Sequence, residues 1–257
     1  MPCAAVNASS SAAPSQLHFS SSYEAKPSIG LARTVEDLNQ AFSLLYDSYV
    51  SAGLTSANSL EMRITPYHLL PTTEVFVAKV AGQVISTLTM TGDNARGLPM
   101  EKMYGKQIAE LRSRTRIAEM GCFADRRQSP ARFMRVFTAL SRFIVQAAQA
   151  RGISALVLAA HPRHAKFYER VLGFQHLGGL TSCPYAQGNP AVALVMDFDS
   201  LRGTDIHQRL FGEPIDSEHL ERTQWTPATT NYLHLLYEQL AESRQPAPCS
   251  AAERIAI

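Results

Sequence analysis

A continuous apolar stretch, ISALVLAA from Ile153 to Ala160, constrains the fold of this chain more than any other feature. A strand with apolar side chains on both faces must be covered on both sides, as in the sheets of layered α/β proteins. An amphipathic segment (129–152) precedes the stretch, and HPRHAKFYERVLGF (161–174) follows it. We therefore predict a long helix, a buried strand and a second helix in succession.

The segments around this centre predict the rest of the sheet. Two β-rich runs flank a tight glycine-containing turn in TEVFVAKVAGQVISTLTMTGD (73–93), which predicts an antiparallel hairpin. Apolar residues at helical spacing from Leu38 to Tyr49, followed by Gly53, predict a helix before it. Further strands are expected at 28–33, 115–125, 173–179 and 189–200, with a helix from Pro99 to near Arg112.

This order of elements predicts a mixed α/β (α+β) fold, in which helices flank a central sheet and a helical extension follows. We expect a disordered Ser/Ala-rich tail, the α/β domain, the helical extension and a frayed end, at 1–27, 28–200, 201–245 and 246–257 respectively. In such a sheet a ligand tends to bind where neighbouring strands part.

Charge and cysteine content exclude several classes of protein. The formal net charge of +2 argues against a general nucleic-acid binder. None of the four cysteines forms a CxxC pair, which argues against a disulfide framework and a zinc knuckle and favours the cytoplasm. The first residues have neither a basic n-region nor a sustained apolar h-region, and no apolar run approaches the ~18 residues of a membrane helix. We therefore expect neither a secretory signal nor a membrane span.

Glu119 is the first candidate for chemistry, because it lies between apolar residues in RIAEMGCF (116–123). A buried carboxylate must be paired or have a raised pKa. Two interpretations stay open at this point. Glu119 is either a general base at the head of a strand or a structural partner of Arg114 or Arg116.

A group of arginines precedes or lies within the predicted long helix, at Arg126, Arg127, Arg132, Arg135 and Arg142. Free backbone N–H groups at a helix N-terminus, together with nearby guanidinium groups, are typical of phosphate sites. The alternative is a solvated helix face opposite the phenylalanine stripe.

Three other side-chain types carry open alternatives. Tyr168 is either a core aromatic or a hydroxyl that faces a cleft and donates a proton. His161 and His164 lie three apart, but without a third ligand they are typical of capping or polar packing, so no metal is expected. Cys122 is a small buried residue or a nucleophile, and the sequence offers it no convincing His/Asp partner set.

The order of the elements and four of their segments resemble a known group of enzymes. The segments are STLTMTGDNARGLPM, LRSRTRIAEMGCFA, HPRHAKFYERVLGF and NPAVALVMDF. In this order and spacing, from about Arg33 to Asp199, they resemble the GNAT acyltransferase superfamily and, within it, N-acyl amino acid synthases of the FeeM type. Those synthases are related in fold to the acyl-homoserine lactone synthases, so the resemblance implies a GNAT-like fold.

The resemblance implies transfer of a long-chain acyl group from acyl carrier protein to the amino group of an amino acid. An acyl-phosphopantetheine thioester would be the donor substrate, no tightly bound cofactor is expected, and membrane contact is at most peripheral, through the product. Glu119 falls on the family's strand glutamate, and Tyr168 falls on the superfamily's helix tyrosine, which is credited with protonating the leaving thiolate. Possible substrate contacts are Asp93, Arg116 and His164.

The same interpretation gives roles to further residues. Backbone N–H groups of Met120, Gly121 and Cys122 would hold the oxyanion. The donor's phosphate or its acidic carrier would bind Arg126, Arg127, Arg132 and Arg135. An apolar channel for the acyl chain would be lined by the phenylalanine-rich helix and by Tyr67, Leu69 and Leu70.

Two departures from the family pattern affect these expectations. The stretch DRRQSPARFM (125–134) lacks the glycines that acetyl-CoA-dependent members place before the long helix, which favours an acyl carrier donor over CoA. His161 stands where the family leads us to expect Asn. The alternatives that stay open are an acetyl-CoA-type N-acetyltransferase, a homoserine lactone synthase and a non-catalytic module that binds an acyl group or its carrier.

Overall fold

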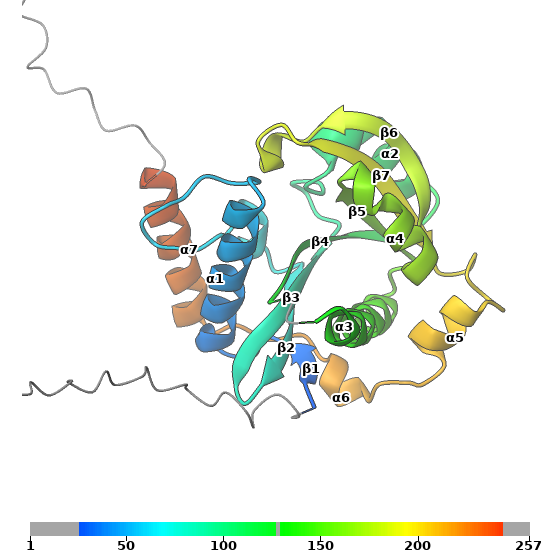
Figure 1. Cartoon of the computed structure of the whole chain (residues 1–257), viewed down its shortest axis with the longest axis horizontal. Coiled ribbons are helices and arrows are strands. Elements are labelled where there is room, and N and C mark those ends of the chain that lie inside the picture. The colour runs from blue at the N-terminus through cyan, green and yellow to red at the C-terminus, as the bar shows by residue number, and fades with distance from the viewer. Residues whose placement is uncertain (1–25, 127–128, 244–257) are drawn as a thin grey trace, which may run out of the picture.

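The computed structural model describes residues 26–126 and 129–243, and these residues form a mixed sheet covered by helices on both faces (Figure 1). The seven strands lie in the order β1-β2-β3-β4-β5-β7-β6. They are β1 (Ser28–Leu31), β2 (Thr73–Val80), β3 (Gln83–Gly92), β4 (Ile117–Asp125), β5 (Ala155–Ala160), β6 (Gln175–Ser182) and β7 (Pro190–Asp197). The predicted α/β layout is therefore confirmed.

The helices of the described residues occur where the sequence pattern predicts them. They are α1 (Val35–Ser51), α2 (Glu101–Arg112), α3 (Pro130–Ala150), α4 (Pro162–Leu172), α5 (Asp205–Phe211), α6 (Ser217–Leu220) and α7 (Pro227–Glu242), with 3-10 turns η1 (Pro66–Leu69) and η2 (Pro184–Ala186). The expected tails fall largely outside the described residues, as do Cys3, Arg127 and Cys249. Within the described part of the chain, no helix is both long and apolar enough to cross a membrane.

Local signals in the sequence fix the ends of these elements. Ala81 and Gly82 both have positive φ, which is the geometry of a tight turn whose twist matches a hairpin. The Ser129 side chain accepts a hydrogen bond from the Arg132 N–H and caps α3, and Pro130 occupies the first turn. Both the hairpin and the start of α3 are thus confirmed.

The two faces of the sheet carry different helices. On one face α3 packs its stripe of apolar residues, including Phe137, Leu140 and Ile144, against the sheet, and α4 lies beside it. On the other face α1 covers β2 to β4, with α7 packed on α1, while α2 covers the region of β5 to β7. Figure 1 shows α1 and α7 together on one side and α3 on the opposite side.

A buried ion pair holds the C-terminal end of α3 against β2. Arg151 donates from Nε and Nη2 to the two carboxylate oxygens of Glu74, at 2.6 and 2.5 Å. Its Nη2 also donates to the Leu220 carbonyl at the end of α6, at 2.7 Å. The Arg222 Nε lies 3.5 Å from the same carboxylate. This cluster therefore ties the segment after β7 to the centre of the fold.

The sheet opens in its middle. β4 and β5 run parallel and pair at Ile117 with Ala155, Ala118 with Leu156 and Glu119 with Val157. Within the described strands the pairing stops there, although β4 continues to Asp125 and β5 to Ala160. Beyond Glu119 the two strands part and leave backbone groups on their facing edges, and the sequence analysis expected a ligand at such a position.

Candidate active site

A cavity of about 1580 Å³ lies where β4 and β5 part. It exceeds the ~300–1,000 Å³ that is typical of a site for a single small molecule. Its wall comes from α1, the segment between α1 and β2, β4, β5, the start of α4 and η2. The cavity therefore has room for two substrates side by side.

Glu119 lies on β4 at the last residue pair before the strands part, and its side chain lines the cavity. The residue is only 8% exposed. The pKa of the carboxyl is raised to about 8, mainly by burial. A hydrogen bond from the Met100 N–H (2.8 Å) lowers this pKa, and the nearby Glu101 carboxylate raises it. A carboxyl with this pKa exchanges a proton near neutral pH.

The alternative in which Glu119 pairs with a neighbouring arginine is wrong. Arg114 forms its ion pair with Glu110 in the preceding helix. Arg116 is exposed, and its guanidinium lies over Gly152 at the far end of α3. Arg116 is not among the residues that line the cavity, so its predicted contact with substrate is not supported by its position.

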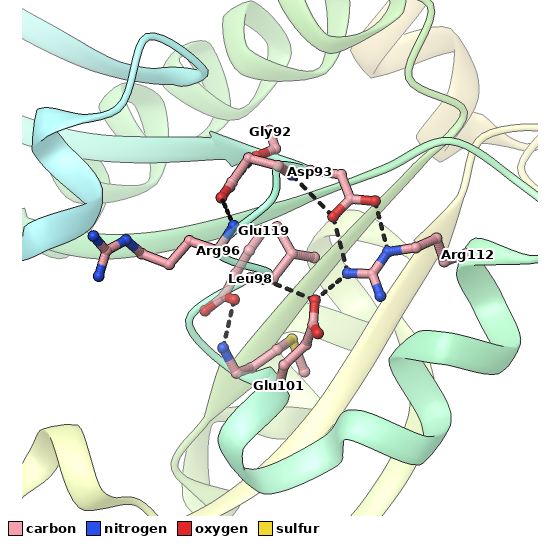
Figure 2. Close-up of polar contacts among 9 residues, drawn as sticks. Gly92, Asp93, Arg96, Leu98, Glu101, Arg112 and Glu119 are labelled. Carbon is pink, nitrogen blue, oxygen red and sulfur yellow. Dashed lines mark hydrogen bonds and ion pairs between the residues drawn. The ribbon is translucent and has the colours of Figure 1, made fainter.

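The loop that holds Met100 against Glu119 is fixed by an ion-pair cluster (Figure 2). Arg112 donates to both oxygens of Asp93, at 2.6 and 2.9 Å, and also pairs with Glu101. The Glu101 carboxylate accepts the Leu98 N–H at 2.8 Å. In Figure 2 the side chains of Asp93 and Glu101 both point to Arg112. Asp93 therefore orders this loop from outside the cavity, which corrects the expectation that it contacts substrate.

A β-bulge shapes the edge of β4 next to Glu119. Thr89 pairs with Gly121 and Thr87 with Ala124, so β4 carries one extra residue opposite β3. Cys122 lies in this bulge with a φ of 49°, a conformation that costs a non-glycine residue ~1–2 kcal/mol. Met120, Gly121 and Cys122, the predicted oxyanion residues, all line the cavity. Bulges of this kind re-aim backbone groups beside active sites.

The Cys122 thiol stays protonated at neutral pH. Burial raises its pKa to about 11, the Arg63 guanidinium lowers it, and Glu119 raises it. A neutral thiol is a poor nucleophile, so the small-residue interpretation of Cys122 is favoured over the nucleophile.

Tyr168 reaches the cavity from the other face of the sheet. Its ring packs edge-on against Phe137 and Phe174 in the α3 layer, and the residue is only half-buried and lines the cavity. The ring is thus part of the core, and the residue also lines the cavity, while its role as a proton donor stays a prediction. His164 also lines the cavity from the first turns of α4, where His161 caps the helix by accepting the Arg163 N–H.

The predicted anion-binding arginines do not form one cluster. Arg126 lines the cavity rim, where its Nε donates to the Val84 carbonyl at 3.2 Å. Arg132 and Arg135 lie in the first turns of α3 outside the cavity wall, and Arg127 lies outside the described residues. Arg142 pairs with Glu213 of the C-terminal segment.

Of the cluster on the α1 face of the cavity, sequence reasoning named only Tyr67. Arg63, Tyr67 and His68 come from the segment before β2, and Tyr185 comes from η2. Burial and the Arg63 charge lower the pKa of His68 to about 4, so this histidine is neutral. The only signal in the sequence was the length of the segment between α1 and β2.

The expected lining of the acyl channel is only partly right. Tyr67 lines the cavity, whereas Leu69 and Leu70 are not part of its wall. Phe133 and Phe137 of α3 instead stack on each other and pack against Phe167 of α4, because α3 turns its apolar stripe into the core. Among the described residues, no group of three or more His, Cys, Asp or Glu is arranged to hold a metal ion.

Comparison with known proteins gives two kinds of match. Residues 40–197 match the family model of the N-acyl amino acid synthase FeeM. Among solved structures, FeeM from uncultured soil microbes superposes with a TM-score of 0.60 at 22% identity, over 71% of this chain and 97% of that one. A comparison with curated proteins found no match.

Other solved structures show the same fold at lower identity. The acyl-homoserine lactone synthase LasI superposes with a TM-score of 0.52 at 19% identity, over 74% of this chain and 96% of that one. BjaI, a CoA-dependent acyl-homoserine lactone synthase with SAM and isopentyl-CoA, superposes at 0.55 and 15% identity, over 82% of this chain and 100% of that one. These structures confirm the GNAT-like fold.

Proposed function

The chain belongs to the N-acyl amino acid synthase family of FeeM and is an acyltransferase, and from that premise we propose that it moves a long-chain acyl group from acyl carrier protein to the amino group of an amino acid. One observation carries the proposal. The buried Glu119 carboxyl, with its pKa raised to about 8, faces a cavity large enough for two substrates where β4 and β5 part.

The first step is deprotonation of the acceptor. An α-amino group has a pKa of ~7.7–8.0 in a peptide, so much of it is protonated at neutral pH and cannot attack a thioester. Glu119 accepts that proton, directly or through a water, and its raised pKa makes it a stronger base than an ordinary carboxylate. The amine nitrogen then bonds to the thioester carbonyl carbon, and the carbonyl oxygen becomes an oxyanion.

The second step is collapse of the tetrahedral intermediate. Backbone N–H groups on the bulged edge of β4, from Met120 to Cys122, stabilise the oxyanion. The carbon–sulfur bond breaks, the nitrogen gives up its second proton to solvent water, and the amide forms. The leaving thiolate takes a proton from Tyr168, which reaches the cavity from α4 and then regains a proton from water.

Replacing Tyr168 by Phe is expected to lower kcat by about tenfold, since a thiolate with a pKa near ~8.5 needs little help from an acid. The ring keeps its packing against Phe137, so the melting temperature should stay near that of the wild type. Single-turnover kinetics with acyl carrier protein checks this. A change in KM for the acceptor with kcat unaltered would contradict the role of Tyr168 in protonating the thiolate.

The stretch before α3 bears on the identity of the donor. The absence of glycine from residues 125–134 supports an acyl carrier donor, because no glycine there lets backbone N–H groups close around a pyrophosphate. The related structures MesI and BjaI are both described as CoA-dependent, so CoA is the competing donor. Two exposed arginines, Arg126 at the rim of the cavity and Arg135 in the first turns of α3, favour the acidic carrier.

The decisive experiment supplies the purified enzyme with a pool of amino acids and either palmitoyl-acyl carrier protein or palmitoyl-CoA, and measures products by mass spectrometry. We expect N-palmitoyl amino acids, formed faster from the carrier. Faster reaction with palmitoyl-CoA would overturn the proposal that acyl carrier protein is the donor, but it would leave the acyltransferase activity in place. Tight carrier binding without product from any amine would favour a binding module instead.

Charge reversal at Arg126 and Arg135 tests the carrier surface. The double change Arg126→Glu and Arg135→Glu is expected to raise KM for acyl carrier protein by about tenfold or more at low salt, with a smaller effect at high salt because ions screen exposed charges. Kinetics at two ionic strengths checks this. Arg202→Glu with Arg209→Glu, on the segment after β7, is the matched control, and equal effects of the two pairs would assign Arg126 and Arg135 to a solvated surface.

A further inference from the structure

Arg63 is a buried cation that faces the cavity. The residue is 8% exposed and lines the cavity wall. Its Nη2 donates to the Tyr185 carbonyl at 3.0 Å, and its guanidinium carbon lies 4.4 Å from the centre of the Tyr49 ring. Its Nε is buried without a hydrogen-bond partner. A guanidinium has five N–H donors, so most of its capacity is unused by the described residues.

No described carboxylate lies within ion-pair distance of Arg63. Within the described residues, Arg63 takes part in no ion pair. The groups that feel its charge are Tyr49, His68, Cys122 and Cys183. Burial raises the pKa of the tyrosine and of both thiols and lowers that of the histidine, so all four are neutral at neutral pH.

Arginine side chains keep their positive charge inside proteins, so burial does not remove the charge of this guanidinium. Buried charges are normally paired, and an unpaired one is costly. Arginine also presents two parallel N–H donors that match a carboxylate. The arrangement is therefore suited to an anion that enters with a substrate.

We propose that Arg63 binds the carboxylate group of the amino acid acceptor. This inference rests on the proposed function, since it names how the second substrate of that site is held. It adds a specificity-determining residue: an amine without a carboxylate would leave Arg63 unpaired.

The face of the sheet on which Arg63 lies supports this choice over the donor's phosphate. Arg63 packs against α1, where its N–H donates to the Phe42 carbonyl and its side chain covers Tyr49. Glu119, the proposed base for the amine, is held on the same face by the Met100 N–H at the start of α2. Tyr168, which serves the leaving thiol, lies in the α3 layer on the opposite face.

The cavity also connects the two groups. Both Arg63 and Glu119 act on the pKa of the Cys122 and Cys183 thiols, with opposite signs, so both lie within electrostatic reach of the same two sulfurs. Tyr185, whose carbonyl accepts from Arg63, and Tyr67 both feel the Glu119 charge. An acceptor placed between these tyrosines can present its amine to one group and its carboxylate to the other.

The test uses product-like probes that need neither donor nor turnover. Binding of N-dodecanoylglycine and of N-dodecanoylglycinamide is measured by calorimetry at pH 7. Glycine carries the α-carboxylate common to all amino acids, and the amide removes its charge with little change in shape. We expect the wild type to bind the acid about tenfold or more tightly than the amide, the ratio that a charge-assisted hydrogen-bonded pair gives.

Arg63→Met should abolish that preference, Arg63→Lys should keep part of it, and Arg202→Met, an exposed arginine outside the cavity, should keep all of it. A wild type that does not distinguish acid from amide overturns the inference, whether or not the variants fold. A rise in KM for the acyl donor in Arg63→Met, with the preference for the acid intact, overturns it in favour of the donor's phosphate.

These results separate the inference from the proposed function. A preference for the acid in a protein that forms no N-acyl product would sustain the carboxylate site and reject the reaction. Product formation without the preference would support the reaction and reject the carboxylate site.

Discussion

Replacing Glu119 by Gln is expected to lower kcat/KM for the amino acid acceptor by about 10²-fold or more, because an amide cannot accept the proton of the amine. The change is conservative in shape. The Gln carbonyl oxygen can still accept the Met100 N–H, which lies 2.8 Å from the carboxylate, so the loop before α2 should keep its position. Steady-state kinetics at saturating donor measures the effect. Unchanged turnover would remove Glu119 from the role of base.

The pH dependence of kcat/KM tests the role of Glu119 as a base in a second way. A base with a pKa of about 8 is mostly protonated at pH 7, so the wild-type kcat/KM should rise as pH increases to about 8 and then level off. Deprotonation of the amine itself adds to this rise. Since Glu119→Gln retains only the amine's contribution, the difference between the two profiles isolates the carboxyl.

The folding stability of the wild type should fall as pH rises, whereas its kcat/KM rises. The unfolded Glu119 carboxyl loses its proton near the ordinary glutamate pKa of 4.5, and the folded one only near a pKa of about 8. Between these values the folded state holds the extra proton, so the stability of the wild type falls as pH rises. Glu119→Gln, which cannot ionise, should therefore gain in melting temperature relative to the wild type from pH 5 to pH 9. No gain would mean that Glu119 is not buried as described.

The second large effect is on folding. Arg151→Met is expected to lower the free energy of unfolding by about 3–5 kcal/mol, because it leaves the buried Glu74 carboxylate without its two-pronged partner. Arg222, 3.5 Å away and more exposed, offsets only part of the loss. Urea unfolding followed by circular dichroism measures the change.

The double variant Glu74→Gln with Arg151→Met supplies the control for this ion pair. It removes both charges and should recover part of the stability, since the uncompensated carboxylate is the main cost. A surface pair such as Arg202 with Asp199, in contrast, should contribute ~0–1 kcal/mol. A loss of that small size in Arg151→Met would show that the pair is effectively solvated.

Most of the fold follows from local sequence signals. The apolar run at 153–160, the turn at Gly82 and the amphipathic segment at 129–152 each have a short-range physical cause, and all three appear in the structure where they were predicted. The parallel junction of β4 with β5 does not follow from such signals. It depends on contacts between residues about forty apart, and no local pattern states where two strands stop pairing.

The candidate site was predictable only in part for the same reason. Glu119 was conspicuous because a charge stood inside an apolar strand, and Tyr168 because the family resemblance pointed to it. Arg63 and His68 lie in a polar, proline-broken segment with no periodicity, and only tertiary packing buries them. Asp93 was misplaced because its partner Arg112, nineteen residues on, could not be chosen from sequence.

The parting of β4 from β5 has a further consequence for how this enzyme is held together. The sheet consists of two antiparallel halves, β1 to β4 and β5 to β7. Three residue pairs between β4 and β5, together with the helices, hold these halves together. On the proposed function, the amide groups of a phosphopantetheine arm would lie beside the open edges and continue the ladder that the chain leaves unfinished. The bound donor would then hydrogen-bond to the edges of both β4 and β5, and its binding would join the two halves of the sheet.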